Sequence, residues 1–205
     1  MMVSLKLVKK LGMNKLGVRA VLLAGSLGLG AATMPVAHAA DYTIDAGHTF
    51  VHFRIQHLGY SWLYGRFNKF SGSFSYDAAN PITNSINMTI DTASVDTNHA
   101  KRDKHLRGSD FLDVEKFPTA RFISSGYKGT AEGGMMSGTL TLNGVTKPIK
   151  IAIKKLGEGK DPWGGYRSGF IGTTKLKRAD FGISYNLGPA SETMESELGI
   201  EGTHT

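Results

Sequence analysis

The sequence predicts an all-β domain, an antiparallel barrel or sandwich of about eight to ten strands. Two observations lead to this prediction. Apolar and polar residues alternate with a period of two along several short segments, and glycine, 26 of the 205 residues, is spread through the connections between them. The alternation leaves one face of each segment polar, which is typical of antiparallel sheets and not of βαβ units.

Residues 1–39 have the pattern of a secretory signal peptide and are set apart from the fold. Five basic residues and no acid come first, and an apolar run that ends at Ala32 follows. Ala37 and Ala39 form an A-x-A cleavage signature. The run is too short and too rich in glycine to span a bilayer. We expect cleavage after Ala39, which leaves residues 40–205 as one mature domain.

The composition of this domain excludes several functions. Five of the 24 basic residues and none of the 17 acids lie in the leader, so the formal charge falls from +7 to 19 minus 17, or +2. Nucleic-acid binding therefore loses its electrostatic basis. The chain has no cysteine, which excludes disulfides, thiolate zinc sites and c-type haem attachment. With the leader, these features predict an exported soluble protein of the periplasm.

The segment TFVHFRIQH, residues 49–57, predicts the first clear strand. Its odd positions form a largely apolar face, made of Thr49, Val51, Phe53, Ile55 and His57. Because successive side chains of a strand point to opposite sides, His57 shares this face and His52 does not. A polar ring at the end of an inward row belongs near the mouth of a barrel. The alternative for His57 is a hydrogen-bonded core histidine.

Further alternating segments follow along the chain. They are FSGSFSY (70–76), INMTID (86–91), TARFISS (119–125) and PIKIAIK (148–154). The pair Asn143-Gly144 between two of the runs predicts a type I′ hairpin turn, which requires positive φ at both positions. The lysines of KPIKIAIKK, residues 147–155, are expected on the solvated side of their strand.

The stretch NHAKRDKHLRGSDFLDVEKFP, residues 98–118, breaks the strand period and predicts a short helical insertion. Thr97 or Asn98 is expected to cap its helix. One face of the helix would carry Arg102, His105 and Leu106. In a barrel, such an insertion closes or rims an opening.

Catalytic and metal sites are weighed against simpler explanations. Asp103 and Arg107 are spaced for an i, i+4 ion pair, whereas Asp103 and His105 together could do acid–base chemistry. GMMSG, residues 134–138, is not a nucleophile elbow and is expected to be a polar turn. The histidines lack a metal-ligand spacing, so we predict no metal and no catalytic residue.

Several ordered motifs resemble the YceI-like family. DYTIDAGHTFVHFRIQHLGYSWLYGRFNKFSG resembles its opening pattern Y-x-I-D-x-x-H-S-x-V-x-F-x-I-x-H-L-G, with Thr49 where the family usually has Ser. KRDKHLRGSDFLDVEKFPTARFIS, GTLTLNGVTKPIKI and LKRADFGI are similar to later family segments. The resemblance spans nearly all of residues 40–205.

The resemblance implies a lipocalin-like antiparallel β-barrel of about eight strands, with a short helical insertion and an amphiphilic lipid in its cavity. The implied ligand is a polyisoprenoid, such as a quinone precursor or a prenyl phosphate, or a fatty-acid derivative, and no cofactor is expected beyond it. Polar groups at the mouth would include His48, His57, Arg102 and His105. The apolar lining would include Phe53, Leu106, Phe111, Phe117 and Phe122.

Two other function classes stay open at this point. One is an enzyme of isoprenoid quinone metabolism that uses Asp103 and His105. The other is a stress-related accessory that docks on a membrane protein, because some members of the family are fused to or sit beside membrane cytochromes of the b type. A homodimer and a transient membrane contact are also left open.

Overall fold

The structure is a computed structural model that describes residues 39–204. The expected leader, apart from Ala39, lies outside the described residues. Within them, the helices are too short or too polar to cross a membrane.

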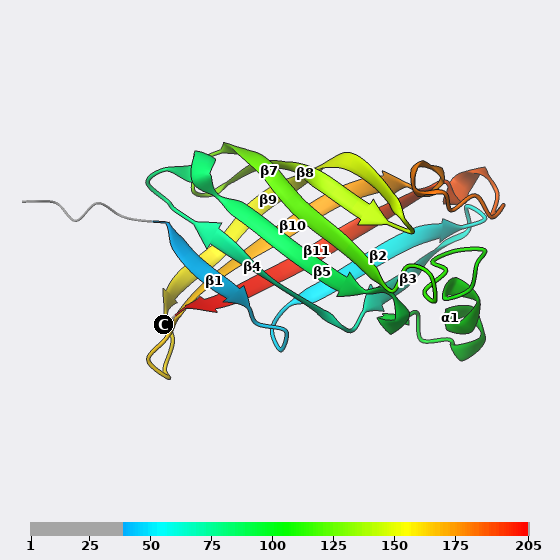
Figure 1. Ribbon diagram of the computed structural model, residues 1–205, viewed down its shortest axis with the longest axis horizontal. Coiled ribbons are helices and arrows are strands. Elements are labelled where there is room, and N and C mark those ends of the chain that lie inside the picture. The colour runs from blue at the N-terminus through cyan, green and yellow to red at the C-terminus, as the bar shows by residue number, and fades with distance from the viewer. Residues whose placement is uncertain (1–38, 205) are drawn as a thin grey trace, which may run out of the picture. The chain divides into compact units, whose positions relative to one another are not determined.

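Eight strands close into an antiparallel barrel (Figure 1). In spatial order they are β1 (Ala40–Ile44), β4 (Phe70–Tyr76), β5 (Ser85–Asp91), β7 (Thr119–Gly129), β8 (Gly133–Leu142), β9 (Val145–Lys160), β10 (Tyr166–Lys177) and β11 (Thr193–His204). β11 pairs back onto β1 and closes the ring. The predicted all-β barrel with about eight strands is confirmed.

Three more strands extend the sheet at one end of the barrel. They are β2 (Phe50–His57), β3 (Ser61–Phe67) and β6 (Val95–Asp96). β11 pairs with β1 at Gly202 and Thr203 and with β2 from Met194 to Gly199, so β2 continues where β1 stops. The helix α1 (Ala100–Leu106) lies at this same end, here called the α1 end (Figure 1).

The chain connections divide between the two ends of the barrel (Figure 1). The β2–β3 hairpin, the β8–β9 turn and the β10–β11 connection lie at the α1 end, the last with the 3-10 helices Arg178–Phe181 and Pro189–Ser191. The far end holds the β7–β8 and β9–β10 turns and the β4–β5 connection with the 3-10 helix Pro81–Thr83. A fourth 3-10 helix, Thr92–Ser94, joins β5 to β6.

Two hairpin turns at the α1 end have left-handed backbone at both central residues. Asn143 and Gly144 have φ of 49° and 74°, which confirms the predicted type I′ turn. Leu58 and Gly59, between β2 and β3, also have left-handed backbone, with φ of 51° and 82°. Leucine is disfavoured in this conformation, since its Cβ is crowded there.

The expectation of a polar turn at GMMSG was wrong. These residues lie inside β8, and Met136 is buried in the core. A Cβ at Gly138 would come within 2.5 Å of the Phe122 ring on β7. The small residues therefore serve the close packing of a large neighbour inside a strand.

Aromatic side chains fill the far end of the barrel. Tyr42 stacks on Phe74 with ring centroids 4.7 Å apart, and Phe170 lies edge-on to Phe74 at 5.6 Å and to Tyr76 at 5.2 Å. Burial raises the pKa of Tyr42 to about 12. This cluster forms the floor of the barrel interior, whereas α1 and its loop lie at the other end.

Candidate functional site

A cavity of about 780 Å³ runs through the barrel. This volume lies in the range of sites that bind small molecules. Residues of both ends line it, from His57 and Tyr185 near α1 to Tyr76 and Lys155 near the floor. Most of the exposed lining residues, Leu58 and Tyr185 among them, lie at the α1 end and form a rim, here called the mouth.

The cavity wall is built from inward-facing rows with a period of two. On β2 the row is Val51, Phe53, Ile55 and His57, as the alternation predicts. On β9 the row is Ile149, Ile151, Ile153 and Lys155. His52 is on the outer side of β2, where its ring stacks on Phe50 at 4.4 Å. Alternation thus gives a lining that is apolar along its length and polar at both ends.

Seven of the nine residues that the sequence offers as ligand contacts line this cavity. They are Phe53, His57, Arg102, His105, Leu106, Phe111 and Phe122. The fold brings them together from β2, α1, the loop after α1 and β7. Their contact with a ligand stays a prediction.

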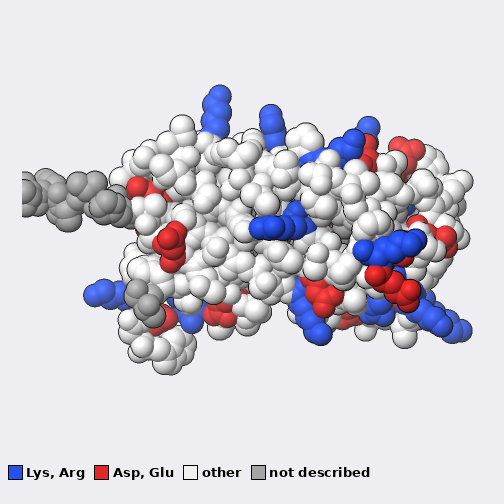
Figure 2. Space-filling view, viewed as in Figure 1, with Lys and Arg blue, Asp and Glu red and all other residues white. Residues whose placement is uncertain are grey.

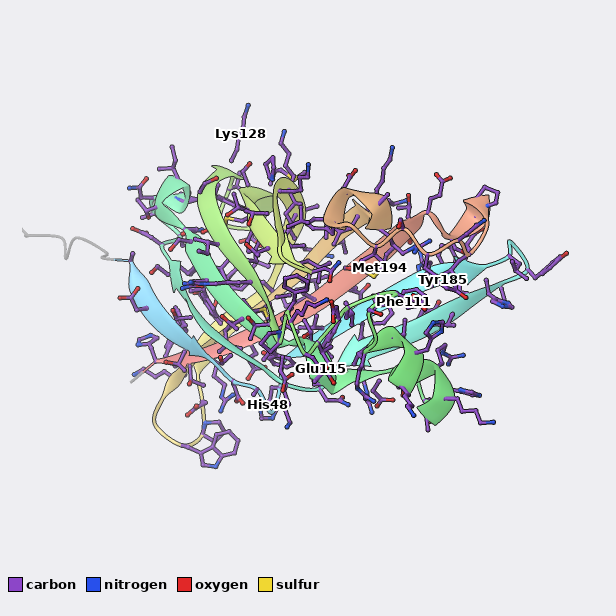
Figure 3. The ribbon with its side chains drawn as sticks, turned by 45° about the vertical axis from the view of Figure 1, so that its right-hand side comes forward. His48, Phe111, Glu115, Lys128, Tyr185 and Met194 are labelled. Carbon is purple, nitrogen blue, oxygen red and sulfur yellow. The ribbon has the colours of Figure 1, made fainter. Side chains whose placement is uncertain are left out.

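The remaining two, His48 and Phe117, do not line the cavity. His48 lies on the turn between β1 and β2, with its side chain 61% exposed and its Nδ1 2.8 Å from Asp45 Oδ2. Figure 3 shows it apart from Phe111, Tyr185 and Met194. Phe117 packs over the β8–β9 turn, where a Cβ at Gly144 would come within 2.4 Å of its ring. Both residues lie in connections outside the inward rows.

The cap of α1 differs from the prediction. His99 caps the helix, and its Nδ1 accepts a hydrogen bond from the Arg102 amide at 3.2 Å. Asn98 has a left-handed φ of 58°, whereas a cap residue requires extended backbone, and Thr97 is engaged elsewhere. The predicted face is confirmed, since Arg102, His105 and Leu106 all line the cavity.

The expected ion pair between Asp103 and Arg107 is absent from the described structure. Asp103 is buried and accepts hydrogen bonds from the amide and the hydroxyl of Thr97. Arg107 donates to the carbonyls of Ala93 and Val95, both at 2.8 Å. Because α1 docks against β6, both side chains satisfy nearby polar groups and not each other.

Two arginines that line the mouth are engaged by the chain itself. Arg102 donates to the Oγ1 and the carbonyl oxygen of Thr97, both at 2.7 Å. Arg178 donates to the carbonyls of Ser191 at 2.7 Å, Ile183 at 3.4 Å and Tyr185 at 3.2 Å. Burial lowers the pKa of Arg178. These guanidinium groups fasten the mouth loops.

An aromatic group lies beside these arginines. The His105 ring is edge-on to Phe111 at 5.0 Å and to Tyr185 at 5.2 Å, and Phe111 lies 5.1 Å from Tyr185 (Figure 3). His105 Nε2 also pairs with Asp110 Oδ2 at 2.9 Å. The sequence reasoning missed Tyr185 and Arg178. Arg178 stands in the segment LKRADFGI, where it could have been found.

The expectation that the lysines of residues 147–155 face solvent is wrong for Lys155. Its side chain is 9% exposed and lines the cavity near the floor. Its Nζ lies 2.7 Å from Tyr76 Oη and 2.8 Å from Glu158 Oε1. Burial favours a lower pKa for Lys155, but the hydrogen bonds to Glu158 and Tyr76 outweigh it and raise the pKa. Lys155 faces inward because it continues the odd-numbered row of β9.

The group Asp45, His48 and Glu201 has ligand atoms close enough to hold a metal ion, but Arg167 supplies the positive charge there. Arg167 Nη1 lies 2.7 Å from Asp45 Oδ2 and 2.5 Å from Glu201 Oε1, and its Nε lies 3.1 Å from Asp161 Oδ2. The hydrogen bond from Arg167 holds the pKa of Asp45 well below its usual range. The cluster is an ion-pair network.

The outer surface carries charges of both signs. On the face shown in Figure 2, Lys and Arg side chains stand beside Asp and Glu, most densely over the α1 end. Wide regions of this face over the barrel wall are uncharged. This mixed pattern lacks the basic stripe that a nucleic-acid surface would show on the visible face.

Comparison with known proteins agrees with the fold. A YceI-like domain family model matches residues 42–202. A UPF0312 protein of Ectopseudomonas mendocina is 59% identical over 186 residues, which cover 89% of this chain and 95% of the relative. The crystal structure of a Campylobacter jejuni YceI protein, 32% identical, superposes with a TM-score of 0.66 and covers 74% of this chain and 90% of that one.

A third comparison extends the likeness in fold to a distant protein. A domain from Saccharophagus degradans, described as a polyisoprenoid binding domain implicated in plant cell wall breakdown, gives a TM-score of 0.59 at 19% identity. The match covers 80% of this chain and 98% of that domain.

Proposed function

Because the chain belongs to the YceI-like domain family, we propose that it binds and carries a long amphiphilic lipid, a polyisoprenoid by preference, without catalysing a reaction on it. The observation that carries the proposal is the cavity of about 780 Å³ within the barrel. Its inward rows on β2 and β9 are apolar except near the two ends, a distribution that matches an amphiphile.

The energetics favour a long chain as the occupant. Each buried methylene group contributes about 0.8 kcal/mol, so an extended hydrocarbon gains affinity without specific polar contacts. The polyisoprenoid binding attributed to the S. degradans domain supports an isoprenoid chain here. Quinone precursors and prenyl phosphates are the candidate ligands that the family resemblance names.

Acid–base catalysis by Asp103 and His105 has less support. The two side chains would have to act together on one substrate. Asp103 is instead buried against Thr97, and His105 pairs with Asp110. We therefore propose a carrier.

The proposed place of action is the periplasm, after removal of residues 1–39. This part of the proposal rests on the basic start, the apolar run and the A-x-A signature. Intact-mass measurement of the exported protein should give a chain that begins at Ala40. An exported chain that retains the apolar run up to Ala32 would contradict it.

The binding proposal is tested by extraction of the protein purified from its native compartment. Organic extraction and mass spectrometry should find a co-purified amphiphilic lipid. Phe53→Asp places a charge on the cavity wall, where burial without a partner is costly, so this variant should lose the lipid. His52→Ala, on the outer face of the same strand, should retain it, and circular dichroism checks that both variants fold. A wild-type protein that is lipid-free and takes up no added isoprenoid refutes the proposal.

A further inference from the structure

The deep end of the cavity contains a largely buried cation with a hydrogen-bond donor that no acceptor of the described chain takes. An ammonium group has three N–H donors. Within the described residues, Lys155 Nζ meets two acceptors, Tyr76 Oη at 2.7 Å and Glu158 Oε1 at 2.8 Å. Both Lys155 and Tyr76 line the cavity, so an oxygen atom of a bound ligand can accept from the third donor.

The Tyr76 hydroxyl adds a second adjustable group. It donates to the carbonyl of Ala131 over 3.4 Å, which is long for an O–H···O hydrogen bond. A ligand oxygen within reach would be a better acceptor for this proton. Lys155 and Tyr76 together thus offer two donors at the floor of a chamber whose rows on β2 and β9 are apolar along their length.

The charge of this end favours a neutral ligand group. Lys155 and Glu158 form an ion pair that carries no net charge. A phosphate or carboxylate placed beside Lys155 would also lie near the Glu158 carboxylate, which repels a second negative charge. A carbonyl, hydroxyl or phenol oxygen can accept a hydrogen bond without this cost.

The two arginines of the mouth are less suited to bind a head group. Arg102 and Arg178 already donate to Thr97 and to backbone carbonyls of the mouth loops. Lys155 stands opposite Phe170 on β10, and that strand continues to Lys177, next to Arg178. The seven residue steps from Phe170 to Lys177 span about 23 Å, so a long chain fits between the two ends.

We infer that Lys155 and Tyr76 form a polar subsite that binds a neutral oxygen group of the lipid at the deep end of the cavity, with the hydrocarbon chain directed toward the mouth. The inference rests on the proposed function, because it concerns the same cavity. It names the ligand class as a long-chain molecule with a neutral oxygen acceptor.

The test uses three probes of matched chain length: hexadecyl methyl ketone, octadecane and octadecyl phosphate. Each displaces a fluorescent fatty probe from delipidated full-length mature protein. Wild-type protein should bind the ketone about tenfold more tightly than octadecane, as a hydrogen bond to a charged group predicts. It should also bind the ketone more tightly than the phosphate.

Variants of Lys155 show whether this residue is responsible for the preference for the ketone. Lys155→Met should lose most of the preference for the ketone over octadecane, and its unchanged affinity for octadecane would show that the cavity is intact. The double variant Lys155→Met with Glu158→Gln, which leaves no unpaired acid, should behave in the same way. Lys154→Met, a change on the exposed side of β9, should keep the preference.

The outcomes separate the inference from the proposed function. A ketone preference that is undiminished in Lys155→Met, or a wild-type protein that prefers the phosphate, overturns the inference and leaves lipid binding intact. Failure of wild-type protein to bind any of the three probes overturns both.

Discussion

The two ends of the cavity hold their cations in different ways. At the mouth, the guanidinium groups of Arg102 and Arg178 donate to a hydroxyl and to carbonyls of their own chain. At the deep end, Lys155 shares its ammonium group between Tyr76 and Glu158 and retains a donor toward the cavity. The mouth cations build the wall, whereas the deep cation is available to a ligand.

This difference in hydrogen-bond partners shows that a cation beside a cavity can bind a ligand head group only if the protein leaves one of its donors free. The planar fork of arginine matches several carbonyls at once, which suits the fastening of loops. A lysine is a point charge with three rotatable donors, and it can serve a ligand while two partners hold it.

The largest expected effect is on stability at the mouth. Arg178→Met removes the donor for three backbone carbonyls of the β10–β11 connection. We expect the free energy of unfolding to fall by about 2–4 kcal/mol, since hydrogen bonds to charged groups are worth more than neutral ones. Denaturant unfolding measures the loss. Stability equal to the wild type would show that the arginine is free, contrary to the structure.

A smaller loss is expected at α1. Arg102→Met removes two hydrogen bonds to Thr97, so the free energy of unfolding should fall by about 2 kcal/mol. The ketone-over-octadecane preference should stay unchanged, because Arg102 fastens the helix and does not meet the head group. Loss of that preference in a folded Arg102→Met protein would move the polar subsite to the mouth.

Arg167 differs from the cations of the cavity because three carboxylates bind it, those of Asp45, Asp161 and Glu201. The pKa of Asp45 and that of Asp161 are lowered in the folded protein, Asp45 chiefly by its hydrogen bond from Arg167. A lowered carboxyl pKa stabilises the fold above the ordinary value of 3.8 and less as the pH falls below it. Arg167→Met should therefore be less stable than the wild type at neutral pH.

This difference between wild type and Arg167→Met should shrink as the pH falls below about 4. Thermal unfolding of both proteins from neutral to acidic pH measures it. A stability difference that is constant across this range would mean that Arg167 acts through packing and not through charge.

The smallest effect concerns the rim. Leu58 has a left-handed φ of 51° and lines the cavity. Leu58→Asn should raise the free energy of unfolding by about 0.5–1 kcal/mol, because asparagine tolerates this conformation in a type I′ turn. The same change should weaken octadecane binding. An unchanged affinity would remove Leu58 from the binding surface.

Strands whose exposed face is polar could be predicted from the sequence. The predicted segments correspond to β2, β4, β5 and β7, and the Asn143-Gly144 turn is confirmed. β3 was not predicted from the sequence because aromatic residues lie on its outward face as well as apolar residues on its inward face. Trp62 and Tyr64 face outward, with Arg54 lying 4.4 Å over the Trp62 ring, so apolar and polar residues do not alternate.

The candidate site was predictable where a residue lay on an inward row or on the predicted face of α1. Phe53, His57 and Arg102 belong to this group. Lys155 was missed because its charge suggested a position in solvent. The alternation of β9 places it on the same inward face as the odd-numbered isoleucines. His48 and Phe117 lie in connections whose direction depends on tertiary contacts, which the local pattern does not contain.

The deep polar subsite is tested most directly by a crystal structure of the mature protein with hexadecyl methyl ketone that carries bromine at the far end of its chain. We expect the chain inside the barrel, the carbonyl oxygen within hydrogen-bond distance of Lys155 Nζ, and the anomalous bromine signal at the mouth near Tyr185. A bromine signal beside Lys155, or a ketone bound only outside the barrel, would contradict it.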